Sequence, residues 1–441
     1  MIQELRSQLD WIESTVRGAQ AVEKVGAVLR VTGLIIESEG PETSIGQICR
    51  ISSSRNRESV DAEVVGFRDN LTLLMALESV HHIHPGCKVK AAGESNQVPS
   101  GNALLGRVID GMGRPLDDKG PLKTPTRDGY HADPPNPLDR RVIKTPFRTG
   151  IKSIDAFVPM GRGQRMGVFS GSGVGKSILL GMIARGSEAD VNVIALVGER
   201  GRELREFVEN DLGPEGMAKS VVVVSTADQT APMRIRAAYL ATALAEGFRN
   251  EGKNVLMLLD SLTRVAMAQR EIGLAVGEPP ASRGYTPSVF SMLPRLLERT
   301  GTSDLGTITS IYTVLVEGDD MNEPVADAVR GFLDGHVVLS RRLANANHYP
   351  AVDVLRSVSR LDRAVCTRDE MELISEARDL MAVYQHNEDL INVGAYVPNT
   401  NPRIDQAIEK QPGIEGFLRQ RYDSLFTRDD AFDQLRNIFS S

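Results

Sequence analysis

The spacing of apolar and polar residues changes several times along the chain, and each change predicts a different structure. In residues 2–16, apolar side chains recur at helical intervals with charges between them, which predicts a short amphipathic helix. Between residues 24 and 90, short β-rich segments separated by Gly, Asn, Ser and Pro predict a small sandwich or barrel. These segments cover residues 25–31, 34–37, 45–51, 63–67, 71–75 and 87–89.

The middle of the chain alternates between strand-like and helical patterns. Before it, residues 94–148 are rich in Gly, Pro and Asp and are expected to connect and pack rather than to form regular strands. The strand-like runs cover residues 165–169, 191–197, 220–225, 255–260 and 307–315, and helical runs include residues 176–184, 203–210 and 234–249. Repeated βα units with apolar strands predict an α/β core, with helices on both faces of a parallel sheet. Beyond about residue 342 the pattern is mostly helical.

Composition agrees with a protein of several domains. A chain of 441 residues exceeds one compact core, so two or three domains are expected. The net charge of −7 and the aromatic content of 5% argue against a dedicated nucleic-acid binder, which needs a basic surface and stacking rings. Short apolar runs, the lack of a basic-then-apolar leader and three widely separated cysteines favour a reduced cytoplasmic protein that is not transmembrane.

One short segment carries the strongest chemical signal, because it follows a predicted strand and opens a predicted helix. It consists of Ser170, Gly171, Ser172, Gly173, Val174, Gly175, Lys176 and Ser177. The glycines allow successive backbone amides to turn toward phosphate oxygens, and the helix N-terminus adds positive potential. In such a loop Lys176 faces the β- and γ-phosphates and the Ser177 hydroxyl is placed to bind Mg²⁺. Ser170 occupies a position that the consensus gives to Gly; a small side chain still clears the turn.

Two carboxylates at the ends of predicted strands extend this site. Asp260 ends the apolar run 255–260, where an aspartate orders Mg²⁺ and its waters. Glu199 follows the run 191–197 and lies at the carboxyl edge of the sheet, where it is able to orient an attacking water. Glu is also favoured at a helix start, so the residues alone leave Glu199 open between these two interpretations.

With these elements in place, the chain resembles the rotary and secretion ATPase family, which includes the ATP synthase catalytic subunit. The resemblance extends from about residue 25 to residue 426 and includes the segments 104–108, 149–155 and 161–165. It implies a RecA-like P-loop core with an N-terminal small β-barrel and a C-terminal helical domain. The domains expected are an amphipathic helix at 1–20, a β-barrel at 21–93, an ATPase domain at 94–345 and a helical domain at 346–441.

The resemblance also implies roles for single residues. Glu199 matches the carboxylate that positions the hydrolytic water, and Arg200 matches its neighbour near the γ-phosphate. Tyr349 matches the ring that stacks on adenine. Arg360 matches the arginine that reaches into the next subunit's site, where such a residue contributes roughly 10³–10⁵ in rate. Without the family, Arg360 is an ordinary surface arginine.

Narrower segments favour one branch of the family. Residues 269–280 and 316–327 are similar to the form seen in type III secretion ATPases, whereas residues 390–396 with 404–408 look closer to the flagellar export branch. We therefore expect a flagellar export ATPase that uses ATP and Mg²⁺ for chaperone release, unfolding or delivery of substrates. The alternatives are a virulence secretion ATPase, a subunit of an ion-translocating synthase, a ring-shaped RNA helicase and a non-catalytic ring subunit.

The same resemblance implies an assembly. One chain carries both the candidate base Glu199 and the candidate finger Arg360, so a homohexamer with sites shared between neighbours is expected. The expected partners are a regulator at the N-terminal helix, a central stalk protein, the export gate and chaperone–substrate complexes, without nucleic acid. The expected location is the cytoplasm, with peripheral attachment at the inner membrane.

Overall fold

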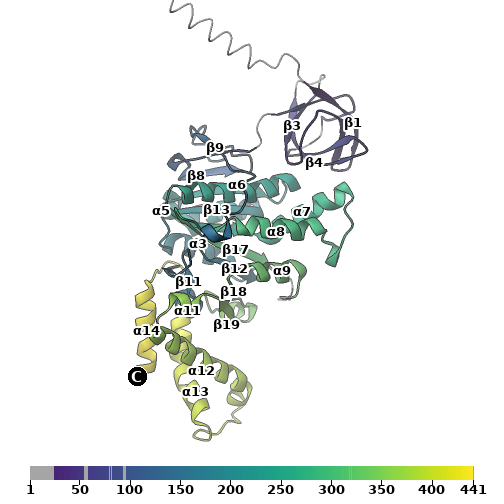
Figure 1. The fold of residues 1–441 in the computed structure, drawn as a ribbon. Coiled ribbons are helices and arrows are strands. Elements are labelled where there is room, and N and C mark those ends of the chain that lie inside the picture. The colour runs from purple at the N-terminus through teal and green to yellow at the C-terminus, as the bar shows by residue number, and fades with distance from the viewer. Residues whose placement is uncertain are drawn as a thin grey trace, which may run out of the picture. The chain divides into compact units, whose positions relative to one another are not determined.

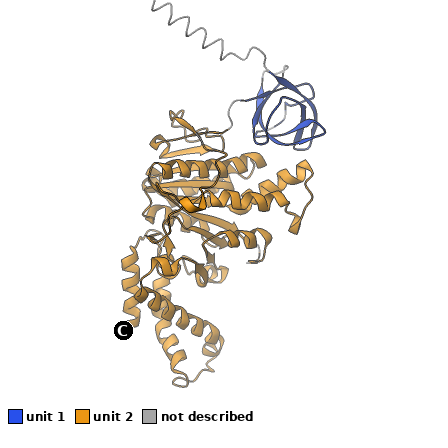
Figure 2. Ribbon diagram, in the orientation of Figure 1, with its two compact units in different colours: residues 1–95 blue, residues 96–441 orange. Residues whose placement is uncertain are grey.

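The computed structural model describes residues 24–440 except 54–57, 79, 81, 93–95, 317 and 319. The chain forms two compact units, residues 1–95 and residues 96–441 (Figure 2). The predicted amphipathic helix at residues 2–16 lies outside the described residues. Within the described part, every helix is too short or too polar to cross a membrane.

The first unit contains a closed barrel of six strands in the order β1-β2-β5-β4-β3-β6, as the short β-rich segments predict. Its strands are β1 Val25–Thr32, β2 Ile35–Glu39, β3 Ile48–Ser52, β4 Ser59–Arg68, β5 Leu71–Ala76 and β6 Lys88–Ala91. Alternate side chains point inward, as in β4, where Val60, Ala62 and Val64 are buried. Together with Ile36 and Leu74 they form an apolar core inside the barrel.

The second unit is built on a nine-stranded sheet with the order β19-β18-β12-β17-β15-β13-β14-β8, and β16 pairs with β17 (Figure 1). The strands are β8 Arg107–Asp110, β12 Arg165–Ser170, β13 Val191–Glu199, β14 Ser220–Thr226, β15 Asn254–Asp260, β16 Gly301–Thr302, β17 Thr307–Leu315, β18 Gly335–Leu339 and β19 Val352–Ser359. All the neighbours from β18 to β8 along this order are parallel, whereas β19 and β16 are antiparallel additions. The predicted α/β core is therefore confirmed.

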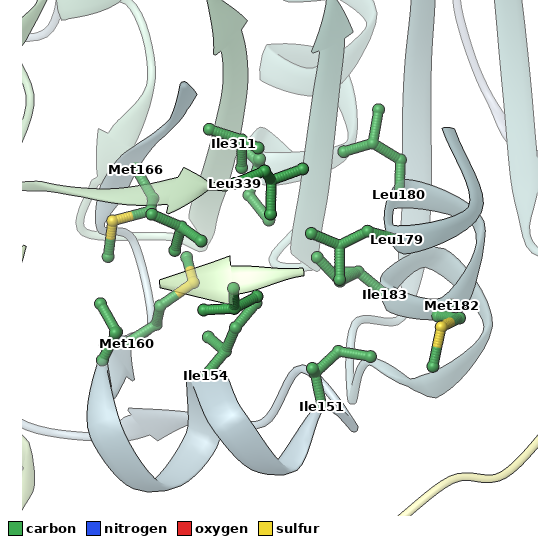
Figure 3. Close-up of a cluster of buried hydrophobic side chains, with 14 of the residues drawn as sticks. Ile151, Ile154, Met160, Met166, Leu179, Leu180, Met182, Ile183, Ile311 and Leu339 are labelled. Carbon is green, nitrogen blue, oxygen red and sulfur yellow. The ribbon is translucent and has the colours of Figure 1, made fainter. Parts of the chain in front are cut away.

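Helices cover both faces of this sheet. On one face α3 (Lys176–Gly186) and α2 (Lys152–Phe157) point apolar side chains at the strands, among them Leu180 and Ile154 (Figure 3). On the other face α6 (Ala231–Asn250) packs against β13, β14 and β15. The remaining described helices of this region are α4 Gly201–Glu206, a π-helix Phe207–Leu212, α5 Gly213–Ala218, α7 Leu262–Val276, a 3-10 helix Ser282–Gly284, α8 Pro287–Glu298, α9 Pro324–Phe332 and α10 Arg341–Asn345.

The C-terminal part is helical, as predicted. It contains α11 Asp362–Val365, α12 Arg368–Asn392, α13 Pro402–Leu418 and α14 Arg428–Ser440 (Figure 1). Thr367 caps α12 through a capping box with Glu370, which also binds the Arg428 guanidinium at 2.5 Å. Arg378 of α12 donates to three backbone carbonyls of α2 and β19, and so ties the helical part to the sheet.

The Gly- and Pro-rich segment 94–148 differs from expectation. It contains β8, which adds a parallel edge strand beside β14, and a small antiparallel pair of β7 (Gln97–Pro99) with β9 (Thr126–Asp128). It also contains two short 3-10 helices, Asn102–Leu104 and Pro137–Asp139, and β10 Pro146–Phe147, which pairs with β11 Met160–Gly161. Strands of two to four residues give no readable alternation, which is why the pattern predicted none. β19 lies beyond residue 345, within the range expected for the C-terminal helical domain. The predicted domain boundaries stay predictions.

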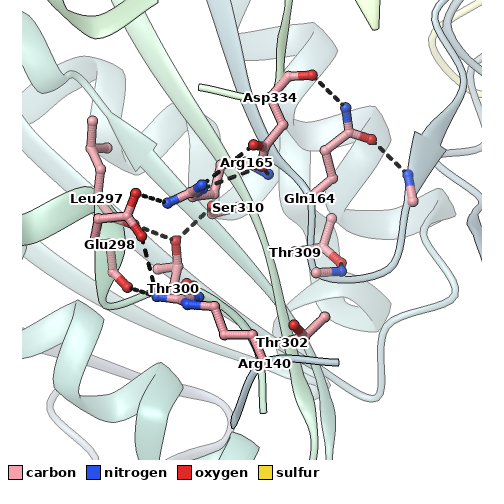
Figure 4. Close-up of polar contacts among 12 residues, drawn as sticks. Arg140, Gln164, Arg165, Leu297, Glu298, Thr300, Thr302, Thr309, Ser310 and Asp334 are labelled. Carbon is pink, nitrogen blue, oxygen red and sulfur yellow. Dashed lines mark hydrogen bonds and ion pairs between the residues drawn. The ribbon is translucent and has the colours of Figure 1, made fainter. Parts of the chain in front are cut away.

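A polar cluster fixes the amino edge of the sheet, where β12 begins. Arg165 forms ion pairs with Glu298 at 2.5 Å and with Asp334 at 3.2 Å (Figure 4). Arg140 donates to the carbonyl of Thr300 at 2.7 Å and also contacts Glu298. These charge-assisted bonds hold the segment that precedes β18 beside the start of β12.

Candidate active site

The loop at residues 170–177 joins β12 to α3 at the carboxyl edge of the sheet. Gly173 and Gly175 have φ values of 76° and 87°, a region that side-chain-bearing residues rarely adopt, and Gly175 is the N-cap of α3 without a side-chain cap bond. The amides of the first turn of α3 have no partners within the helix. The side chain of Val174, in the same loop, packs in the apolar core. The predicted phosphate loop thus has the backbone form that anion binding requires.

Two neighbouring strands bring their terminal carboxylates to this loop. β13 ends at Glu199 and β15 ends at Asp260, and both strands run parallel to β12. Lys176 Nζ lies 3.3 Å from Glu199 Oε1 and also donates to Asp260 Oδ1. Asp260 accepts a further bond from Thr313 Oγ1 at 2.7 Å. The fold therefore brings Lys176, Glu199 and Asp260 together, although the first and the last of them lie 84 positions apart in the chain.

Burial and charge shape the titration of this group. Burial of Lys176 acts to lower its pKa, but Asp260 and Glu199 outweigh burial and raise the pKa, so the ammonium stays charged. Burial raises the pKa of Glu199, and the charge of Asp260 adds to this effect against the opposing charge of Lys176. A carboxylate with a raised pKa beside a fixed cation is typical of a catalytic base.

A cavity of about 440 Å³ opens in front of these residues. It is lined by Gly171, Ser172, Gly173, Gly175, Lys176, Ser177, Ile178, Gly198, Glu199, Arg200, Glu203, Ala227, Arg264 and Leu315. The sequence reasoning did not single out Arg264. It lies in the first turn of α7, where Ser261 Oγ caps its backbone amide, and its buried Nε has no hydrogen-bond partner among the described residues. An arginine just after a strand-terminal carboxylate is the signal that was available in the sequence.

The structure also brings Tyr349 to the loop. A Cβ atom added to Gly175 would lie 3.3 Å from Cε1 of the Tyr349 ring, so the ring rests on the loop backbone. The tyrosine is 40% exposed and lies in the turn between α10 and β19. Arg200 lines the cavity with an exposed side chain, 3.5 Å from Glu203.

Arg360, in contrast, lies at the opposite edge of the sheet. Its backbone amide donates to the carbonyl of Asp334 at 2.9 Å, and the Asp334 carboxylate binds Arg165 at the start of β12. β12 has six residues, and at about 3.3 Å per residue the two edges are roughly 20 Å apart. The structure does not bring Arg360 to the cavity of its own chain.

Three models of known protein families match successive parts of the chain. Residues 28–93 match the ATP synthase alpha/beta family β-barrel domain, residues 150–359 match its nucleotide-binding domain, and residues 366–437 match the T3SS EscN ATPase C-terminal domain. The chain is 53% identical to the flagellum-specific ATP synthase of Bacillus subtilis over 98% of both chains.

Comparison with solved structures points to the same family. The assembled ATPase EscN of the enteropathogenic E. coli type III secretion system superposes with a TM-score of 0.88 at 42% identity, over 94% of this chain and 99% of that one. EscN in complex with its central stalk EscO gives a TM-score of 0.86 at 41% identity over the same shares. The resemblance inferred from the sequence is confirmed: the chain belongs to the ATP synthase alpha/beta family, in the group that holds flagellum-specific and type III secretion ATPases.

Proposed function

We propose that this chain hydrolyses ATP, with Mg²⁺, to drive protein export by a flagellar type III apparatus. The observation that carries the proposal is the placement of Lys176 between Glu199 and Asp260 at the mouth of a phosphate-type loop. The identity of 53% to the flagellum-specific relative, against 45% and 47% for two type 3 secretion system ATPases, favours the flagellar branch over the virulence branch.

The residues at the loop fit a magnesium ion. Asp260 offers a carboxylate and Ser177 a hydroxyl, and Mg²⁺ prefers such hard oxygen ligands and keeps several waters and phosphate oxygens. The ion would neutralise phosphate charge during hydrolysis. Thr313 holds the Asp260 carboxylate in place through a bond of 2.7 Å.

The other residues divide binding from chemistry. Lys176 and the loop amides bind the phosphates, and Arg200 and Arg264 add positive charge at the cavity wall. Glu199 accepts a hydrogen bond from the attacking water and orients it toward the γ-phosphate. The Tyr349 ring stacks on the adenine base, next to Gly175.

Arg360 acts in the neighbouring subunit. Because its backbone is bonded at the amino edge of the sheet, roughly 20 Å from its own loop, it cannot reach its own cavity. An arginine that completes the next site needs a ring, and a homohexamer of this chain supplies one such contact for every cavity.

The assembly has further expected partners. The complex of EscN with its central stalk EscO supports a stalk protein as one of them. The N-terminal segment 1–20 is proposed to bind a regulator, and the assembled ring is proposed to bind the export gate and chaperone–substrate complexes. The ring is placed at the cytoplasmic face of the inner membrane, without a nucleic-acid partner.

One titration tests the shared site. ATPase activity per chain is measured against protein concentration, while mass photometry follows assembly in the same samples. Activity should rise steeply as rings form, because isolated chains lack the neighbour's Arg360. Constant activity per chain across a verified monomer-to-hexamer transition would overturn the shared site. Co-purification with flagellar export proteins, rather than with virulence proteins or an ion-driven rotor, tests the branch.

A further inference from the structure

Gln420 lies just after α13 and joins three parts of the second unit. The residue is 7% exposed, and its backbone amide donates to the carbonyl of Tyr349 at 2.9 Å. We propose that Gln420 is a positioning residue that holds the Tyr349 ring against the phosphate loop. It thereby sets the affinity for the base of the nucleotide and not for its phosphates. The inference rests on the proposed function, since it takes Tyr349 as the base-stacking ring.

The side-chain amide of Gln420 makes three bonds to backbone groups. Its Oε1 accepts from the amide of Lys152 at 2.9 Å, and its Nε2 donates to the carbonyl of Gly150 at 2.8 Å. Nε2 also donates to the carbonyl of Ser424 at 2.9 Å. Lys152 is itself buried, so its amide has no water to replace a lost partner. One side chain therefore fixes the segment after α13 to the start of α2.

The start of α2 is rigidly attached to the helix that carries the phosphate loop. Gly150 packs against Gly186 at the end of α3, so closely that an added Cβ would lie 3.0 Å from the Gly186 Cα. Arg185, also in the last turn of α3, donates to the carbonyl of Tyr422 at 2.7 Å. The segment bearing Gln420 is thus bound to α2 and α3 together, and α3 begins at the loop.

The turn that holds Tyr349 depends on the same segment. The carbonyl of Asn347, whose φ is 54°, accepts from Arg419 Nη1 at 2.9 Å, and the carbonyl of Tyr349 accepts from Gln420 N. The two residues that hold this turn, Arg419 and Gln420, are consecutive in the chain. If Gln420 loses its hold on α2, the segment shifts and the tyrosine turn shifts with it. The loop amides, Lys176 and Ser177 make no bond to Gln420, so phosphate binding does not change.

The test compares a nucleotide with its phosphate part alone. Calorimetry on the full chain measures binding of Mg-ADP and of Mg-tripolyphosphate to wild type, Gln420→Met and the shorter Gln420→Asn. We expect ADP binding to weaken on the order of tenfold, from one or two buried groups left unpaired, and tripolyphosphate binding to stay at the wild-type level. In turnover assays KM for ATP should rise with kcat nearly constant.

Gln164→Met is the matched control. Gln164 is fully buried and also bonds to backbone, accepting from Gly161 N at 2.8 Å and donating to the carbonyl of Asp334 at 3.0 Å. It should lose thermal stability as Gln420→Met does, yet keep the wild-type ratio of ADP to tripolyphosphate affinity. A fall in that ratio for Gln164→Met as large as for Gln420→Met would overturn the inference.

The outcomes separate this inference from the proposed function. If Tyr349→Ala weakens ADP binding but both Gln420 variants keep wild-type affinity, the positioning role is wrong and the base site stands. If the Gln420 variants weaken ADP and tripolyphosphate equally, Gln420 is only structural and the inference is wrong. If the wild type binds neither ligand, the proposed function itself fails.

Discussion

Replacing Glu199 by Gln removes one negative charge from the cavity and keeps the size of the side chain. The carboxylate is 18% exposed and lies 3.3 Å from Lys176 Nζ. Because Asp260 still binds Lys176, the variant retains a charged, ordered lysine for the phosphates. A positioned base contributes about 10²–10⁴-fold to a rate. Turnover of Glu199→Gln should therefore fall by a factor in this range while Mg-ADP affinity is retained.

The assay pairs steady-state ATPase rates of assembled rings with calorimetry on Mg-ADP. Glu206→Gln is the matched control, since Glu206 lies on the helix α4 that follows Glu199 and pairs with Arg202 at 2.5 Å. It removes an equal charge and should leave turnover near the wild-type rate. Wild-type turnover in Glu199→Gln, or an equal loss in Glu206→Gln, would refute the assignment of the base.

The pH profile of the same enzyme gives a second measurement on Glu199. Burial, aided by Asp260 and opposed by Lys176, raises its pKa above the ordinary value of 4.5. Since only the ionised form orients the water, activity should be lost at a higher pH than an ordinary glutamate would give. The acid limb of kcat/KM should therefore lie above 4.5 in wild type and in Glu206→Gln. It should be absent from the residual activity of Glu199→Gln.

Three further predictions concern other parts of the chain. Arg360→Ala rings should bind ADP normally but turn over ATP roughly 10³-fold more slowly. Rings mixed from Arg360→Ala and Glu199→Gln chains should regain activity where the Glu199 of one variant meets the Arg360 of the other, and no recovery on mixing would contradict a shared site. The buried Arg299 guanidinium lies 2.6 Å from the Glu246 carboxylate, so Glu246→Leu should lower the free energy of unfolding in urea by about 3–5 kcal/mol. The double variant with Arg299→Met should recover part of this loss. Burial raises the pKa of Cys49 and Cys366 to about 11, so alkylation at pH 8 should be slow in the native protein and fast in urea; rapid native labelling would contradict this burial.

Much of the fold could be predicted because its signals are local. The strand run 191–197 and the helix run 176–184 correspond to β13 and α3 within two residues at each end. The phosphate loop was equally readable, because its glycines and Lys176 are consecutive in the chain. β8 was missed since a four-residue edge strand between Gly106 and Gly111 carries too few alternating positions.

The site was less readable where it depends on distance. Sequence order places Glu199 and Asp260 at strand ends but does not give their shared contact with Lys176. Gln420 gave no signal at all, because its partners Gly150, Lys152 and Tyr349 lie about 70 residues or more away in the chain. Such long-range contacts are fixed by tertiary packing, which no local pattern contains.

The placement of the phosphate loop and Arg360 on opposite edges of one sheet gives the subunit a direction. In the shared-site ring proposed above, contacts between subunits are head-to-tail, so one surface of a chain meets a different surface of the next. A head-to-tail contact closes into a ring only when its rotation divides the circle, and otherwise winds into an open spiral. The number of copies is therefore set by the angle of that contact and not by the chemistry of the cavity.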